Sequence, residues 1–266
     1  MNPLLRWAGS KKQLVPILAS HWSEKYQRYV EPFAGSGVLF FSIKPNTALI
    51  GDINKELIDT YLSVKYHAIE VAEELSHFKL SEKEYYRVRS LALSEIGRIE
   101  RAARFIFLNR FCFNGLYRTN NAGNFNVPFG GIGRTGKLPT FEFLTEVARM
   151  LKGATLVAGD FQKVLDQTKS GDFVYLDPPY VNSESRTFIE YGPEVFTEAD
   201  LERLSEQLET MQRNRVTFLL SYKDCVEARK IFKEWKISTV TVRRNIAGFS
   251  GARKYSNEIL VTNGKV

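Results

Sequence analysis

Residues 172–180, with the sequence DFVYLDPPY, constrain the fold of this chain more than any other stretch. The apolar run before Asp177 lacks helical periodicity and follows Gly171, which predicts a buried strand. Pro178 and Pro179 cannot donate to a sheet ladder, so the strand must end there. Open α/β sheets bind ligands at the carboxyl ends of their strands. This corner offers a carboxylate, free carbonyls and the ring of Tyr180, which suit a planar substrate bearing an amino group. Taken alone, it also fits a strand-ending turn with a capping Asp and a core Tyr.

A second predicted strand end leads into a glycine-rich turn. The short strand closes on Glu31, and the sequence PFAGSG follows before an apolar helix. Glycines let the backbone approach a ligand closely at a helix N-terminus. Phe40 stands where the third glycine of a GxGxxG fingerprint belongs, which argues against a nicotinamide cofactor. An ordinary glycine-rich turn is the alternative.

Two further strand ends carry acids. Asp52 ends the predicted strand 48–52, near the distance from the glycine turn at which nucleotide-binding folds grip a ribose. Asp160 and Phe161 follow the strand 154–158. Parallel strands of one sheet end at one edge, so their acids are expected to surround one pocket for a nucleoside cofactor and a planar amine. These acids are Glu31, Asp52, Asp160 and Asp177.

The strand–helix alternation stops between the second and third of these strands. Helical stretches are predicted at 67–79, 81–93 and 95–110, and their many basic residues stand near glutamates, which favours a solvated face for most of them. Residues 111–136 form a long loop rich in Asn, Arg and aromatics, with hairpin-like turns. Loops of this length are usually functional, and Asn and Arg side chains read base edges.

Smaller features complete the predicted topology. Ser10 is expected to cap a helix that begins beside Lys11 and Lys12. The polar loop 181–195 is a candidate lid, and the basic, Gly-rich loop 247–254 joins two final strands at an antiparallel end of the sheet.

The charge balance favours a polyanionic partner. With 37 Lys and Arg against 30 Asp and Glu, the 266-residue chain carries a formal charge of +7. Two distant cysteines indicate neither a disulfide framework nor a zinc site, and no metal is expected. No apolar run approaches the roughly 18 residues of a membrane span, so no membrane partner is expected.

Several separate motifs, in one order over residues 5 to about 262, resemble the Dam-type DNA adenine methyltransferases of the D12 class, which are N6-adenine-specific. They are WAGSK from Trp7, EPFAGSG from Glu31, FNGLYR from Phe113, FNVPFG from Phe125 and DPPY from Asp177. The resemblance implies an α/β, Rossmann-like S-adenosylmethionine-dependent methyltransferase sheet with an inserted, mainly helical DNA-recognition domain. It places the catalytic domain at 1–60 and 141–266, and the recognition domain, with its hairpin-like loop, at 61–140.

The resemblance also implies a role for individual residues. Those expected to bind S-adenosylmethionine are Trp7, Lys11, Glu31, Phe33, Gly35, Ser36, Asp52, Asp160, Phe161 and Asp177. Asp177 and the Pro178 carbonyl are expected to accept the N–H groups of adenine N6, and Tyr180 to stack on the flipped base. Those expected to contact double-stranded DNA are Arg6, Phe113, Asn114, Leu116, Arg118, Asn126 and Pro128.

The recognition loop is most similar to those of members that methylate GATC, with Arg118 reading a guanine. Its Gly-rich continuation at 131–136 departs from the family pattern, so the resemblance does not determine the outer bases of the recognition site. We expect a monomer in a bacterial cytoplasm, at the nucleoid or encoded by a phage or plasmid. The resemblance leaves open a role in restriction-modification, in the host or in a phage.

The sequence is compatible with three alternatives. The enzyme can methylate another planar amine, such as cytosine N4, RNA adenine or a protein amide, although Asp177 and the insert weigh against these. A catalytically silent DNA-binding module and a nicotinamide enzyme are the other two.

Overall fold

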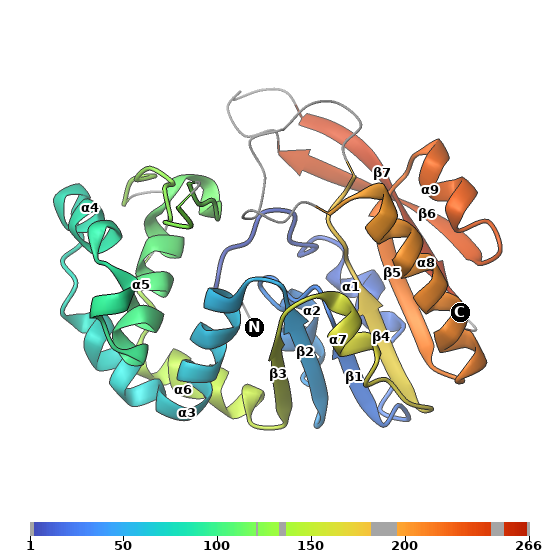
Figure 1. The fold of residues 1–266 in the computed structure, drawn as a ribbon, viewed down its shortest axis with the longest axis horizontal. Coiled ribbons are helices and arrows are strands. Elements are labelled where there is room, and N and C mark those ends of the chain that lie inside the picture. The colour runs from blue at the N-terminus through green and yellow to red at the C-terminus, as the bar shows by residue number, and fades with distance from the viewer. Residues whose placement is uncertain (1–2, 121, 133–136, 182–195, 246–252, 265–266) are drawn as a thin grey trace.

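The structure is a computed structural model that describes residues 3–120, 122–132, 137–181, 196–245 and 253–264. The Gly-rich stretch 133–136, nearly all of the candidate lid and most of the basic loop at 247–254 lie outside the described residues. Figure 1 shows helices α4 and α5 on one side of a central sheet and helices α8 and α9 on the other.

The sheet has seven strands in the order β3-β2-β1-β4-β5-β7-β6. The strands are β1 (Arg28–Glu31), β2 (Ala48–Asp52), β3 (Ala154–Ala158), β4 (Asp172–Leu176), β5 (Thr217–Lys223), β6 (Lys236–Asn245) and β7 (Arg253–Thr262). Strands β1 to β5 pair in parallel, and β7 runs antiparallel to both β5 and β6. The predicted α/β class and the antiparallel end are confirmed.

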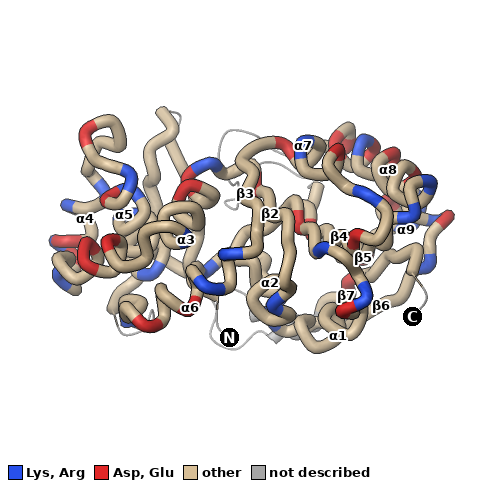
Figure 2. The backbone as a smooth tube through the Cα atoms, turned by 90° about the horizontal axis from the view of Figure 1, so that it is seen from below, with Lys and Arg blue, Asp and Glu red and all other residues tan. Residues whose placement is uncertain are grey.

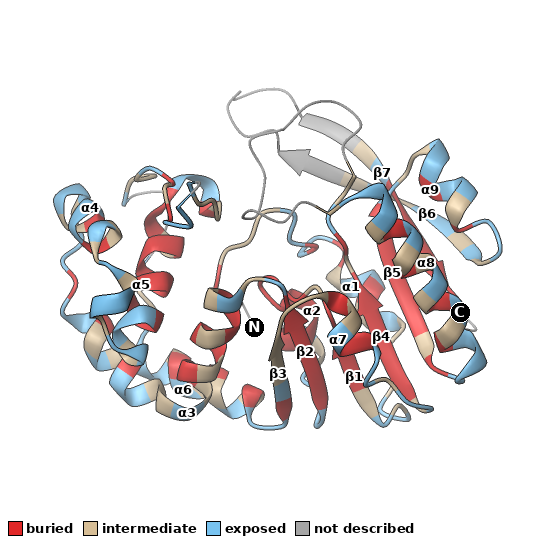
Figure 3. Cartoon of the chain, viewed as in Figure 1, coloured by how far each residue is buried: buried red, intermediate tan, exposed pale blue. Residues whose placement is uncertain are grey.

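Helices cover both faces of the sheet. They are α1 (Val15–Ser20), α2 (Val38–Ile43), α7 (Phe161–Leu165), α8 (Glu198–Arg213) and α9 (Val226–Ile231). Side chains alternate between the faces of a strand, so each strand contributes to two cores. Tyr29 and Tyr175 lie in the core with α1 and α2, whereas Val30 and Val174 lie in the core with α7 and α8. Figure 3 shows the buried strands between these layers.

The helical insertion lies between β2 and β3, as predicted. It comprises α3 (Lys55–Ser76), α4 (Glu82–Ser90), the 3-10 turn η1 (Leu93–Glu95), α5 (Arg98–Phe111), the turn η2 (Phe113–Gly115) and α6 (Phe141–Leu151). Helix α3 kinks at His67, which has non-helical dihedrals (φ −140°, ψ 41°), and this is the residue at which the predicted helix 67–79 begins. Helix α3 runs through the expected domain boundary at residue 60, and the boundaries themselves stay a prediction.

The prediction that Ser10 caps the first helix is wrong. Helix α1 begins at Val15 after Leu14, and its N-terminus has no side-chain cap. Pro16 explains the later start, because proline is preorganised for the first turn of a helix and needs no partner for a missing N–H. Ser10 instead receives a hydrogen bond from Ser36 Oγ at 3.4 Å. Within the described residues, no helix is long and apolar enough to cross a membrane.

Candidate active site

One face of the sheet gathers acids at its carboxyl edge. Tyr29 and Glu31 are two residues apart on β1 and therefore lie on the same face of the sheet. Tyr175 and Asp177 share that face on β4 and its continuation, and the face packs against the core that holds α1 and α2. Asp52 ends β2 on the same side as Ile50. The pairing of β1 with both β2 and β4 makes these strand ends neighbours. The predicted convergence of Glu31, Asp52 and Asp177 is therefore found.

Lys11 supplies the positive charge for this edge. Its ammonium lies 2.7 Å from Asp177 Oδ1 and 3.9 Å from Glu258 Oε2, and it donates to Tyr180 Oη at 3.2 Å. Burial opposes the charge on Lys11, but the carboxylates of Asp177 and Glu258 outweigh it and hold the lysine pKa above its ordinary value. Burial raises the pKa of Asp177, and Lys11 counters this shift. The 2.7 Å ion pair with Lys11 favours the ionised carboxylate, which retains 20% side-chain exposure.

Glu31 faces the interior beneath this corner. It is 2% exposed, and Tyr29 Oη donates to its Oε2 at 3.0 Å. Burial raises the pKa of Glu31 well above its ordinary value, and the nearby carboxylates of Asp177 and Asp52 add to the shift.

Asp52 organises the glycine turn. Its two oxygens accept the backbone N–H groups of Gly35 at 2.9 Å and of Asn54 at 2.8 Å. Burial nevertheless raises the pKa of Asp52 to about 6, against the lowering effect of these two donors. Gly35 has φ +48°, and a Cβ there would lie 2.6 Å from Trp7 Cδ1. Only glycine fits this position, because the conformation and the indole both exclude a side chain.

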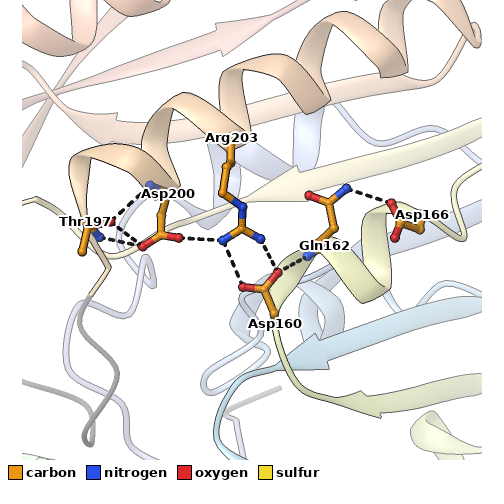
Figure 4. Close-up of polar contacts among 6 residues, drawn as sticks. All are labelled: Asp160, Gln162, Asp166, Thr197, Asp200 and Arg203. Carbon is orange, nitrogen blue, oxygen red and sulfur yellow. Dashed lines mark hydrogen bonds and ion pairs between the residues drawn. The ribbon is translucent and has the colours of Figure 1, made fainter.

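The residues that follow β3 contact helix α8 (Figure 4). Asp160 caps α7 by accepting Gln162 N–H at 2.9 Å, and it pairs with Arg203 Nη2 at 2.8 Å. Arg203 also lies 4.7 Å above the ring of Phe161 and pairs with Asp200, which closes the capping box of α8 with Thr197. Phe161 is buried beside Phe33, with ring centroids 5.3 Å apart. The predicted neighbours Asp160 and Phe161 are thus fixed by α8.

The loop after α5 folds back on itself as a hairpin-like segment. Isolated antiparallel bridges join Cys112 to Phe129 and Thr119 to Phe125. Arg118 Nε donates to Asn126 Oδ1 at 2.8 Å across this segment, and a hollow beside the pair includes Asn120. Of the predicted DNA contacts on this segment, Phe113, Asn114 and Pro128 are exposed. Leu116, Arg118 and Asn126 are half-buried.

The basic residues of the helical insertion have ordinary roles. Arg87 pairs with Glu84, and buried Arg104 donates to the carbonyls of Val88 and Arg89. Figure 2 shows basic and acidic residues interspersed along α4. The predicted solvated face of mixed charge is found on α4. Arg104 departs from that prediction, because its side chain is buried.

The N-terminal segment joins the insertion to the glycine turn. Asn109 brackets the backbone of Arg6, accepting its N–H at 2.8 Å and donating to its carbonyl at 2.7 Å. The guanidinium of Arg6 donates to the Arg110 carbonyl at 3.2 Å. Trp7 stacks on Tyr117, with ring centroids 5.8 Å apart and planes 21° apart. Trp7 therefore lies between the glycine turn and the hairpin-like segment.

Sequence reasoning missed several of these contacts. Ser221 donates to Asp177 Oδ1 at 3.1 Å, and Tyr117 donates to Glu56 Oε2 at 2.9 Å. The sequence does mark Ser221, because this polar residue follows the apolar run of β5 and lies on the face of the sheet that carries Asp177. Glu258 shows the same pattern on β7, since it lies two residues before Leu260 on one face. Nothing in the local sequence marks Glu56 or Asn109, whose partners are 61 and 103 residues away.

We expect Tyr117→Phe to lower the free energy of unfolding by about 0.5–1.5 kcal/mol, because it removes the hydrogen bond to the half-buried Glu56 and keeps the ring. Urea denaturation measures this change. Tyr66→Phe is the control, since Tyr66 is 62% exposed and its substitution should alter stability by less than about 0.5 kcal/mol. Equal stability of Tyr117→Phe and the unsubstituted protein would contradict the expectation.

Comparison with known proteins identifies the family. Residues 7–246 match the model of the D12 class N6 adenine-specific DNA methyltransferases. The chain is 34% identical to the type II methyltransferase M1.LlaDCHI of Lactococcus lactis subsp. cremoris, over 99% of this chain and 95% of that protein. It is 32% identical to the DNA adenine methylase of Salmonella typhi, over 96% and 93% respectively.

A solved structure of precorrin-6y C5,15-methyltransferase from Geobacter metallireducens aligns with a TM-score of 0.42 and 10% identity, over 98% of this chain and 97% of that chain. The assignment rests on the sequence matches. This chain belongs to the D12 class of N6 adenine-specific DNA methyltransferases and is an adenine-specific DNA methyltransferase.

Proposed function

We propose that this enzyme transfers a methyl group from S-adenosylmethionine to N6 of an adenine flipped out of duplex DNA, within the sequence GATC. The observation that carries the proposal is the position of Asp177. Its ionised, partly exposed carboxylate lies on the sheet edge that also carries Asp52 and the glycine turn.

The residues at the glycine turn fit a nucleoside cofactor. Asp52 is 8% exposed and accepts one backbone N–H on each oxygen, which leaves lone pairs for ribose hydroxyls. Gly35 lets the backbone at this edge of the sheet approach a ligand without a side chain in between. Lys11, Trp7 and Ser36 line the same edge. When bound, S-adenosylmethionine supplies a methyl group already activated by its sulfonium.

The protein's part in the chemistry is to shape the acceptor nitrogen. The N6 lone pair is delocalised into the purine, so the free amine is a poor nucleophile. We assign Asp177 to accept one N–H and the Pro178 carbonyl to accept the other. Two acceptors favour a pyramidal nitrogen and stabilise the positive charge that develops on it. Alignment of the amine with the methyl group lowers the barrier further.

Tyr180 and the hairpin-like segment handle the DNA. A base inside the stack is out of reach, so the target must leave the duplex. Tyr180 is half-buried and packs edge-on to Tyr222, which leaves it fixed beside Asp177 as a stacking surface. Phe113 is 43% exposed at the start of the segment and suits insertion beside the gap. Arg118, oriented by Asn126, is assigned to a guanine of the site.

Labelled S-adenosylmethionine and duplexes with GATC or a scrambled site test the proposal. We expect label at adenine N6 of the GATC duplex alone, and product identification distinguishes cytosine N4. We expect Asp177→Asn to lower turnover at least 10²- to 10³-fold, because the amide is a weaker acceptor, while the duplex still binds. Label on cytosine, or undiminished turnover by Asp177→Asn, would contradict the proposal.

Arg118→Ala should lose about 1–3 kcal/mol of discrimination at one base pair, because a bidentate contact to guanine disappears. Competition binding with duplexes substituted one pair at a time measures this loss. Arg87→Ala is the control, since Arg87 pairs with Glu84 on the exposed face of α4. A uniform loss across all duplexes would instead identify Arg118 as a phosphate contact.

The affinity for S-adenosylmethionine should fall as the pH drops through about 6. The folded-state pKa of Asp52 is raised to about 6, so its carboxylate is ionised above that pH and protonated below it. Protonation converts an acceptor of ribose hydroxyls into a donor on one oxygen. Calorimetric titration across this range measures the change, and Asp52→Asn should remove the step near pH 6. A step that persists in Asp52→Asn would assign it to another group.

A further inference from the structure

The contacts of Asp177 are distributed unevenly between its two oxygens. Lys11 Nζ lies 2.7 Å from Oδ1, and Ser221 Oγ donates to the same Oδ1 at 3.1 Å. Among the described residues, both side-chain donors to this carboxylate therefore reach one oxygen. Oδ2 is the oxygen left for an incoming N–H.

The hydrogen atoms of this network can be assigned from its chemistry. An ionised carboxylate only accepts, so the single hydroxyl hydrogen of Ser221 must go to Asp177. The oxygens of Tyr175 and Ser221 are 2.9 Å apart, and Tyr175 must then be the donor. Burial raises the pKa of Tyr175 well above its ordinary value, which keeps that donor protonated. The result is a one-way relay from Tyr175 through Ser221 to Asp177.

The sheet builds this relay from two adjacent strands. Leu176 of β4 is in register with Leu220 of β5, so the next residues, Asp177 and Ser221, are cross-strand neighbours. Tyr175 precedes Asp177 by two residues and shares its face. Ser221 is fully buried, so it has no contact with solvent and its hydroxyl has a fixed environment.

We propose that Ser221 is a positioning residue for methyl transfer: it holds Asp177 in the rotamer that presents Oδ2 to adenine N6. The inference rests on the proposed role of Asp177. Lys11 alone does not define that rotamer, because an ammonium on a flexible stem follows the carboxylate. Ser221 is anchored on a central strand and fixes the direction of the bond as well as its length.

The test compares three substitutions by single-turnover methylation of a GATC duplex. Ser221→Ala removes the donor, and we expect the rate of methyl transfer to fall about 10-fold or more, as for a lost hydrogen bond to a charged group. Ser221→Cys keeps the shape with a weaker donor and should be intermediate. Tyr175→Phe removes only the outer donor of the relay and should cost less than Ser221→Ala.

Binding measurements separate positioning from general damage. Ser63→Ala is the matched control, because Ser63 is also buried but donates to the Asp59 carbonyl on α3. All four variants should bind S-adenosylhomocysteine and the duplex with Kd values within about 2-fold of the unsubstituted enzyme. An unchanged rate in Ser221→Ala, or a rate loss matched by weaker binding or by lost structure, would overturn the inference.

The pH profile gives a second readout. Ser221 stabilises the ionised form of Asp177, so its loss raises the pKa of that carboxyl and moves the acidic limb of the single-turnover rate to higher pH. The other titratable groups near Asp177 are unchanged in Ser221→Ala: Lys11, Glu31, Glu258, Tyr29, Tyr175 and Tyr180. A fall of equal size at every pH would mark Ser221 as merely structural. Full activity of Asp177→Asn would instead refute the proposed function.

Discussion

Charge compensation by Lys11 is the interaction on which this edge of the molecule depends. Burial disfavours the ionised forms of Asp177 and Glu31, and the Asp177 and Glu258 carboxylates both face the lysine ammonium. A buried charge without a partner costs several kcal/mol, and the ion pair with Lys11 offsets this cost for the Asp177 carboxylate. The N-terminal loop that carries Lys11 is therefore part of this edge, although it precedes the first strand.

Strand alternation decides which side chains meet at that edge. Tyr175 and Asp177 on one strand, Ser221 on the next and Glu258 on β7 all project from the same face. A shift of one residue in the register of β5 would replace Ser221 by an apolar neighbour and leave Asp177 with Lys11 alone. The diproline after Asp177 ends β4 at that point and so protects the register of the corner.

Local motifs predicted the strands, the insertion and the edge where the acids converge, because a strand end punctuated by glycine or proline has few alternatives. They did not predict the start of α1 at Val15. The partners Glu56 and Asn109 also escaped, since contacts across 61 and 103 residues depend on how the insertion packs. The assignments of Asp177, Arg118 and their neighbours to substrate and DNA remain proposals drawn from family resemblance and supported by geometry.

The stack of Tyr117 on Trp7 bears on the modularity of such enzymes. The ring next to Arg118 touches the indole that abuts Gly35, while its hydroxyl reaches the first turn of α3. A hairpin-like segment transplanted from a relative would carry its own residue at position 117 into this contact. Chimeras that exchange this segment should therefore take Trp7, Glu56 and the segment together, as one unit.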